Sequence, residues 1–153
     1  MKLAIVGLGG SYSDYIAARI RSEHFDEVWG INCVGGIIHV DKTIMMDPVS
    51  RFLDSDDAGS QTGIARKFLE KNTKPIITCE MDSRVKHLEL YPLEAVIKDL
   101  NVCYFNNTVP YAIAYAIYYG VKELCLYGLD YTYKNVSMAE AGRACTEFWC
   151  AIA

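Results

Sequence analysis

The sequence predicts an α/β fold in which a mostly parallel sheet of about six strands lies between two layers of helices. Short apolar runs alternate with longer segments of helical period, the pattern of a parallel sheet with crossover helices. The first run, at 3–6, is continuously apolar, as expected for a central strand covered on both faces. A glycine-rich turn follows at 7–11, where Rossmann-like folds pass from the first strand into the first helix. We therefore expect one Rossmann-like three-layer domain spanning residues 1–153.

Six apolar runs are the predicted strands. Glycines at 35 and 36 break the second run, and Asp47 and Pro48 stop the third. The predicted strands lie at 3–6, 27–33, 42–46, 75–79, 102–105 and 124–127.

The helices are predicted from residues at helical spacing and from their capping residues. Pro92 suits the first turn of a helix, Thr108 the N-cap of the next one, and Gly120 its left-handed C-cap. The segment 137–140 has the spacing of a capping box. The polar stretch at 54–63 instead predicts a solvated loop without a metal. The predicted helices lie at 13–21, 63–71, 92–100, 109–119 and from 137 onward.

Composition limits the classes of partner. The formal net charge is −4, from 15 basic and 19 acidic side chains, which argues against a nucleic-acid groove but not against a single nucleotide. No segment has the length of about 18 apolar residues that spans a membrane, and the N-terminus lacks a signal-peptide pattern. None of the six cysteines has Cys-x-x-Cys spacing, so we expect free, buried thiols in a reducing compartment. The expected location is the cytoplasm.

The C-terminal segment is strongly apolar up to its end. Phe148, Trp149 and Ile152 lie on the last predicted helix, which has no C-cap. Three interpretations stay open: the side chains pack on the sheet, they form a homodimer contact, or the natural chain continues beyond Ala153.

The glycine turn is the first candidate binding site. Gly7, Gly9 and Gly10 allow the backbone to turn sharply and approach a phosphate, and the following helix offers free N–H groups. Ser11 adds a hydroxyl. Tyr12 stands where the dinucleotide fingerprint has its third small residue, which weakens an NAD or FAD assignment. A tight turn without a ligand remains the alternative.

Further polar residues are predicted at the carboxyl ends of other strands, where ligands bind in open α/β sheets. Asn32 ends the second strand, where NAD proteins usually carry an acidic residue for the ribose. Asn107 and Thr108 precede a helix N-terminus, and Asp130 follows the last strand behind Gly128. Each of them is also compatible with an ordinary turn residue or helix cap.

The order of these motifs resembles the MptE-like family, typified by archaeal 6-hydroxymethylpterin diphosphokinases, and the related bacterial sialyltransferases that bind CMP-sialic acid. The resemblance rests on the Asn-Asn-Thr of 106–108, on Gly120 to Glu123 before an apolar strand, and on the Gly-Leu-Asp-Tyr of 128–131. The family's first turn reads Gly-x-Gly-Pro-Ser, and here Gly10 replaces the proline. The likeness extends from Lys2 to about Trp149.

The resemblance implies a nucleotide, of the ATP or CMP type, in the crevice at the carboxyl ends of the strands. Ser11, Asn32, Asn107, Thr108 and Asp130 match the positions that line this crevice. It also implies Mg²⁺ bound with the nucleotide, for which Asp130 is a candidate ligand. Asp47, at the end of the third strand, is a second candidate carboxylate.

The expected function is therefore a nucleotide-binding transferase that moves a diphosphate or related group from a nucleoside triphosphate or nucleotide sugar to a small acceptor. Asp130 and His39 are its candidate catalytic residues, His39 as a general base unless it is an ordinary loop histidine. The alternatives are a non-catalytic nucleotide-binding module, a sialyltransferase-like enzyme, whose base-bearing insertion is missing here, and a nicotinamide-dependent oxidoreductase.

Overall fold

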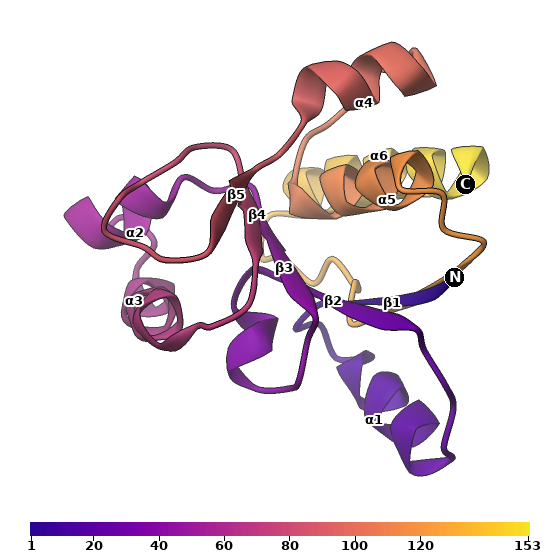
Figure 1. The fold of residues 1–153 in the computed structure, drawn as a ribbon, viewed down its shortest axis with the longest axis horizontal. Coiled ribbons are helices and arrows are strands. Elements are labelled where there is room, and N and C mark those ends of the chain that lie inside the picture. The colour runs from indigo at the N-terminus through magenta and orange to yellow at the C-terminus, as the bar shows by residue number, and fades with distance from the viewer.

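The fold is known from a computed structural model, which describes the backbone of residues 1–153 and every side chain except that of residue 60. One six-stranded sheet has the strand order β5-β4-β3-β2-β1-β6, and all five strand pairs are parallel (Figure 1). The predicted α/β fold with a parallel sheet is confirmed. The strands are β1 (Lys2–Val6), β2 (Glu27–Ile31), β3 (Lys42–Met45), β4 (Ile76–Thr78), β5 (Leu88–Leu90) and β6 (Glu123–Tyr127).

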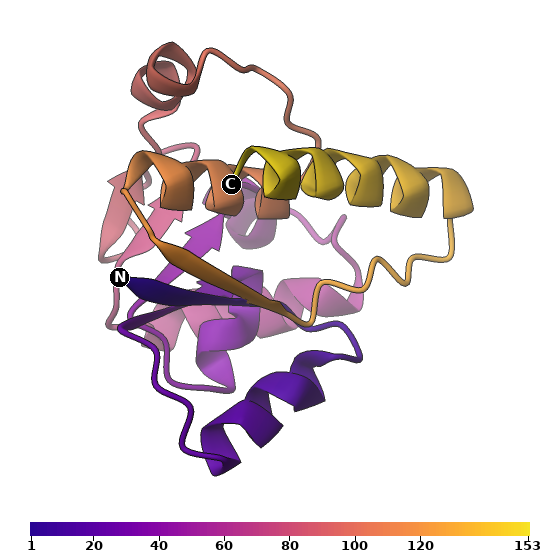
Figure 2. The ribbon, with the colours of Figure 1, turned by 90° about the vertical axis from the view of Figure 1, so that its right-hand side faces the viewer.

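Helices cover both faces of this sheet. In Figure 1, α4 (Leu93–Leu100), α5 (Thr108–Tyr118) and α6 (Val136–Ile152) lie above it, and Figure 2 shows α6 running alongside α5. On the other face lie α1 (Tyr12–Ile20), the 3₁₀ helix η1 (Asn32–Gly36) and α3 (Ser60–Lys71), with the short α2 (Val49–Asp54) beside α3. None of the described helices is long and apolar enough to span a membrane.

The central strand β1 explains the continuous apolar run in the sequence. Leu3 and Ile5 pack in the cluster under α5 and α6, whereas Ala4 and Val6 pack against α1 on the opposite face. All four side chains are fully buried. Because successive residues of a strand point to opposite faces, a strand covered on both faces needs apolar residues at every position.

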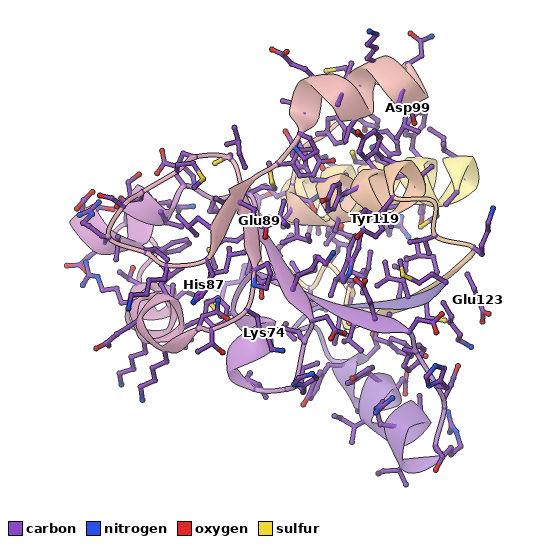
Figure 3. All side chains as sticks on the ribbon, viewed as in Figure 1. Lys74, His87, Glu89, Asp99, Tyr119 and Glu123 are labelled. Carbon is purple, nitrogen blue, oxygen red and sulfur yellow. The ribbon has the colours of Figure 1, made fainter. Side chains whose placement is uncertain are left out.

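The layer above the sheet is rich in aromatic rings. The ring of Tyr119, labelled in Figure 3, lies 6.0 Å from that of Trp29, and the ammonium group of Lys42 lies 4.6 Å from the Tyr119 ring. At the other end of this layer Trp149 is fully buried, and its Nε1 donates to the carbonyl oxygen of Tyr104 at 2.7 Å. Trp149 therefore packs into the core, while Phe148 keeps 39% of its surface exposed.

The strand predicted at 102–105 is wrong. The fifth strand is β5 at Leu88–Leu90, and residues 102–105 form an irregular segment. The carbonyl oxygen of Tyr104 accepts from Trp149 Nε1 and from Cys145 Sγ, so this stretch is held by α6 rather than by a neighbouring strand. β5 escaped prediction because it has only three residues and buries only Leu88.

Several local predictions need correction. Within the predicted loop at 54–63, only 55–59 is irregular, because α2 ends at Asp54 and α3 begins at residue 60. The N-cap of α5 is Asn107, whose side chain accepts from Val109 N at 3.0 Å, and not Thr108. Likewise Asn135, and not the capping box at 137–140, caps α6. The predicted left-handed conformation of Gly120 is confirmed by its φ of 78°.

The cysteines are free, as expected, but the expectation that they are buried holds in full only for Cys145. Cys79, Cys103 and Cys150 are exposed: Cys79 follows β4, Cys103 lies in the irregular segment at 102–105, and Cys150 lies on the outer side of α6.

Candidate functional site

Two adjacent hollows lie at the carboxyl edge of the sheet, with volumes of about 490 Å³ and 420 Å³. They are formed by the chain after β1, β2, β3 and β6, by α3 and by the start of α5. β1 lies between β2 and β6, so the order of the strands reverses there, and such a reversal opens a crevice in doubly wound sheets. Both volumes fall in the range of small-molecule sites. The two hollows share a wall made by Ile31, Asn32, Val109 and Tyr133.

The structure brings most of the predicted site residues to this crevice. Gly7, Gly9, Gly128 and Asp130 line the larger hollow, together with Asn32. The smaller hollow is lined by Asn32 and by three more of the predicted residues, namely Asp47, Asn107 and Thr108.

His39 does not reach the crevice, so its proposed role as a general base there is wrong. Its side chain is 75% exposed and its Nε2 lies 4.0 Å from Asp41 Oδ1. The connection after β2 forms η1 at the carboxyl edge and then returns to the opposite edge before β3 begins. Asp41 N there donates to Val28 O at 2.8 Å, which places His39 near the amino ends of the strands.

The glycines of the first turn are explained by a close crossing of two backbone segments. Gly7 N donates to Tyr127 O at 2.8 Å, and a Cβ added at Gly7 would lie 2.5 Å from Gly128 O. Gly128 itself has a φ of 67°, and a Cβ there would lie 2.8 Å from the carbonyl carbon of Gly7. The two segments therefore require glycine whether or not a ligand binds.

The next residues of the turn are held in the same way. Gly9 N donates to Gly128 O at 2.8 Å, and a Cβ at Gly9 would overlap the carboxylate of Asp130. Ser11 N donates to Asp130 Oδ2 at 2.8 Å, directly before α1 begins. At Gly10, in contrast, an added Cβ meets no atom within 4 Å.

Asp130 therefore occupies the position at the N-terminus of α1 where the sequence predicted a phosphate. A carboxylate is favourable there because it accepts from the free N–H groups and faces the positive end of the helix dipole. The hydroxyl of Ser11 is also engaged, since it accepts from Gly128 N at 3.1 Å. Neither Ser11 nor Gly10 lines either of these two hollows.

A polar network fixes the start of α5 beside the smaller hollow. Asn107 Oδ1 accepts from Val109 N at 3.0 Å and from the Tyr131 hydroxyl at 3.2 Å, and Asn107 Nδ2 donates to Asn106 Oδ1 at 2.7 Å. The Tyr131 hydroxyl also contacts Thr146 Oγ1 on α6. Asn107 is thus mainly occupied in joining α5 to the chain after β6 and to α6.

Tyr131 has a structural role that was not predicted from the sequence. It has a φ of 52°, and burial raises the pKa of its hydroxyl. Its ring packs on Gly142 of α6, where an added Cβ would lie 2.6 Å from Tyr131 Cε1. A glycine inside an otherwise regular amphipathic helix is the signal that identifies this contact.

The two candidate carboxylates do not form a shared metal site. Asp47 lines the smaller hollow and pairs with Arg51 at 2.7 Å, whereas Asp130 lines the larger one and accepts from Ser11 N. Within the part of the chain that the structure describes, no group of three or more His, Cys, Asp or Glu side chains is arranged to hold a metal ion. The residues present do not fit a magnesium ion held by the protein alone.

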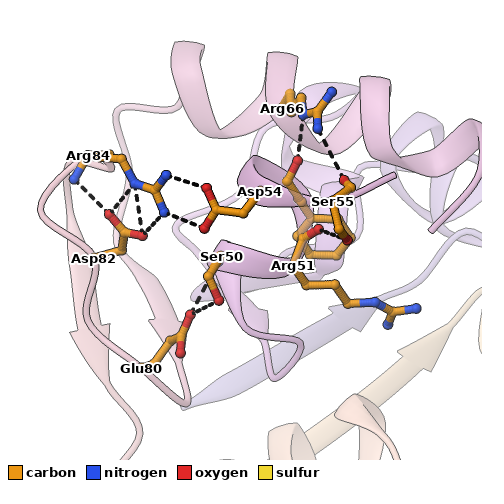
Figure 4. Close-up of polar contacts among 9 residues, drawn as sticks. Ser50, Arg51, Asp54, Ser55, Arg66, Glu80, Asp82 and Arg84 are labelled. Carbon is orange, nitrogen blue, oxygen red and sulfur yellow. Dashed lines mark hydrogen bonds and ion pairs between the residues drawn. The ribbon is translucent and has the colours of Figure 1, made fainter. Parts of the chain in front are cut away.

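Basic side chains are engaged next to the crevice rather than in it. Among the described residues that line the two hollows, none is Lys, Arg or His. α2 carries Arg51, and Arg84 anchors the end of this helix by bridging Asp54 at 2.6 Å and Asp82 at 2.6 Å (Figure 4).

Cys33 lies in the wall of the larger hollow. Burial raises the pKa of its thiol to about 11, which disfavours the thiolate, the reactive form of cysteine.

Asn32 is the residue of the shared wall with the most unusual environment. Its φ is 53°, in the left-handed region, and its Oδ1 is buried without a hydrogen-bond partner. Ile31 and Val109, which share the wall, are each 7% exposed and offer no side-chain donor.

A comparison with protein-family models, curated proteins and solved structures finds no significant match. The resemblance to the MptE-like family therefore stays a prediction from the motifs quoted above.

Proposed function

We propose that the chain is a nucleotide-binding transferase that binds the nucleotide in the larger hollow and a small acceptor in the smaller one. The observation that carries this proposal is the pairing of two hollows along one wall, at the reversal of strand order. Group transfer requires the donor and the acceptor to lie side by side with their reacting atoms in near contact. A domain that only binds a nucleotide needs one of these hollows.

The charges of the crevice determine which part of the nucleotide the protein would hold. The amides of Gly7, Gly9 and Ser11 are engaged by protein atoms, and the lining has no basic side chain. We therefore propose that the nucleoside lies in the larger hollow and that the phosphates extend to the edge of the smaller one, beside the acceptor and toward Arg51. Magnesium would be bound by those phosphates, since Mg²⁺ commonly takes its ligands from substrate phosphates and water.

Asp47 is the candidate general base for the acceptor. It lies in the smaller hollow, and its ion pair with Arg51 fixes the position of one carboxylate oxygen. A carboxylate in that position accepts the proton of an acceptor hydroxyl as the hydroxyl oxygen attacks the transferred group; the bond from that group to the rest of the nucleotide breaks, and the shortened nucleotide leaves with the electron pair. Asp130, held by Ser11 N, would orient the glycine turn rather than take part in proton transfer.

The alternative is a nucleotide-binding module without catalysis. It is favoured by the self-contained glycine turn, in which protein atoms already fill the place of a phosphate. The two functions differ in turnover and not in binding.

Calorimetric titration with ATP, GTP, CTP, CMP and NAD, each with and without Mg²⁺, tests the binding part. Tyr133 lies in the shared wall with 54% of its surface exposed, so Tyr133→Ala should weaken nucleotide binding without unfolding the protein. Tyr118→Ala is the matched control, because Tyr118 is 40% exposed on α5 and lines neither hollow. Binding of NAD alone, or equal effects of the two variants, would contradict the proposal.

Arg51→Gln tests the position of the phosphates. It should weaken binding of the triphosphate while leaving the nucleoside unaffected, and Arg143→Gln on the exposed side of α6 should change neither. Phosphorus NMR of the bound nucleotide with a set of small hydroxylated acceptors then measures transfer. Tight binding without conversion of any acceptor would identify the module instead.

A further inference from the structure

The wall between the two hollows contains an acceptor without a donor. Asn32 Oδ1 is buried and has no hydrogen-bond partner. Three other buried side-chain oxygens of the described residues are also unpaired, those of Thr43, Thr62 and Thr78, but they line neither hollow. Asn32 alone combines an unpaired buried oxygen with a place in the crevice.

The backbone holds this side chain in place. Asn32 is the first residue of η1, directly after β2, and has a φ of 53°, a conformation that asparagine adopts more readily than most residues but that still costs free energy. An unpaired buried oxygen is a second cost, since nearly all buried polar groups have partners. Two unfavourable features at one residue of a binding crevice indicate a role that is fulfilled only when a ligand is present.

Neighbouring protein groups do not supply the missing donor. The side chains of Ile31 and Val109 are apolar, and the backbone N–H of Val109 is taken by Asn107. Tyr133 completes the wall, but it is more than half exposed. Asn32 lines both hollows, and rotation of its amide about the Cβ–Cγ bond changes the direction of the oxygen without moving the backbone.

We infer that Asn32 is a specificity-determining residue that accepts a hydrogen bond from an N–H or O–H group of the ligand. The inference rests on the proposed function, because it assigns the residue that selects the nucleoside part. Two donors of a nucleoside have the required chemistry: the exocyclic amino group of cytosine or adenine, and a hydroxyl of the ribose. A carbonyl oxygen at the same place accepts only from Asn32 Nδ2, and that orientation leaves Oδ1 unpaired in the wall, so a carbonyl-bearing ligand gains less.

Calorimetric titration with free nucleosides tests this assignment apart from any phosphate contact. Two pairs, cytidine with uridine and adenosine with inosine, differ in that an amino group of the first is a carbonyl in the second. A third pair, cytidine with 2′-deoxycytidine, differs by one ribose hydroxyl. The wild-type protein should prefer the member that carries the amino group or the 2′-hydroxyl in at least one pair. The expected preference is about tenfold, the value of one neutral hydrogen bond. Asn32→Gly, which tolerates the left-handed backbone, should reduce that ratio to about one. Asn32→Asp keeps an acceptor and should retain the preference.

The melting temperature of the free protein supplies an independent readout. If Oδ1 is unpaired in the free state, Asn32→Gly should melt at or above the temperature of the wild type. A clearly lower melting temperature, equal affinities within every pair, or the absence of nucleoside binding would each overturn the inference. Selective nucleoside binding without any gain from phosphates or any transfer would instead overturn the proposed function and leave Asn32 as the selector.

Discussion

Gly9→Ala is the substitution that most directly tests why the glycine turn exists. An added Cβ at Gly9 would overlap the Asp130 carboxylate and lie 2.8 Å from Gly128 O. The overlap forces Asp130 away from Ser11 N, which removes a charge-assisted hydrogen bond, and it strains the bond from Gly9 N to Gly128 O. Such bonds contribute about 1.5–3 and 0.5–1.5 kcal/mol respectively. Because this turn is solvent-exposed, we take the lower part of the range, about 2–3 kcal/mol.

Thermal unfolding followed by circular dichroism measures this effect. For a chain of this size, each kcal/mol lowers the melting temperature by roughly 2–4 °C, so Gly9→Ala should melt about 4–12 °C below the wild type. Gly10→Ala is the control in the same turn, since its Cβ meets nothing within 4 Å, and it should change stability by less than about 0.5 kcal/mol. Equal melting temperatures for the two variants would refute the crossing of backbones as the reason for glycine at position 9.

Three further predictions follow from contacts elsewhere in the fold. Gly142→Ala should destabilise the protein by about 1–2 kcal/mol, because overlap with the Tyr131 ring outweighs the gain in helix propensity. Gly63→Ala in α3, where an added Cβ meets no atom within 4 Å, should be neutral or stabilising. Chemical denaturation measures the free energy of unfolding of both variants, and a stabilised Gly142→Ala with a destabilised Gly63→Ala would contradict this reasoning. Tyr131→Phe removes the hydrogen bonds to Asn107 and Thr146 and should cost about 1–2 kcal/mol, whereas Tyr133→Phe at the exposed neighbour should leave the denaturation midpoint unchanged. Hydrogen bonds from Arg84 lower the pKa of Asp82 to about 2 and also lower the pKa of Asp54, so the contribution of these carboxylates to stability is complete above about pH 4 and is lost as the pH falls toward 2. The difference in melting temperature between the wild type and Arg84→Gln should therefore shrink between about pH 4 and about pH 2. A constant difference would show that the ion pairs of Arg84 are not its cause.

Local sequence patterns were sufficient for most of the fold. The continuous apolar run at 3–6 and the turn residues after the other apolar runs correctly predicted five of the six strands. Helical spacing correctly predicted α1, α3, α4, α5 and α6. β5 and α2 were missed because three and six residues are too few to show a period. The segment at 102–105 was misassigned because Val102 and Phe105 pack against the core beneath the helices, and apolar character alone does not distinguish that environment from a strand.

The site was predictable in position but not in its internal contacts. Parallel strands all end at one edge, so the residues after β1, β2 and β6 could be expected to meet. The hydrogen bond from Ser11 N to Asp130 joins residues 119 positions apart, and no local pattern reports such a pairing. Glycine at positions 7 and 9 suggests a phosphate site when read alone, because a sequence does not show whether a ligand or the chain itself occupies the space beside a glycine. The prediction for His39 was wrong for a related reason. η1 lies between β2 and residue 39 and reverses the direction of the chain, so His39 lies away from the carboxyl edge of the sheet.

The crossing of the glycine turn with the chain after β6 also constrains how the protein is made. During synthesis the turn at residues 7–11 emerges early, yet the atoms that satisfy its N–H groups belong to Tyr127, Gly128 and Asp130. β1 has the same dependence, because one of its two partners is β6. One edge of β1 and the N–H groups of its turn therefore stay unpaired until residues 123–130 have been synthesised. We expect this interval to be the period in which the nascent protein most depends on chaperones.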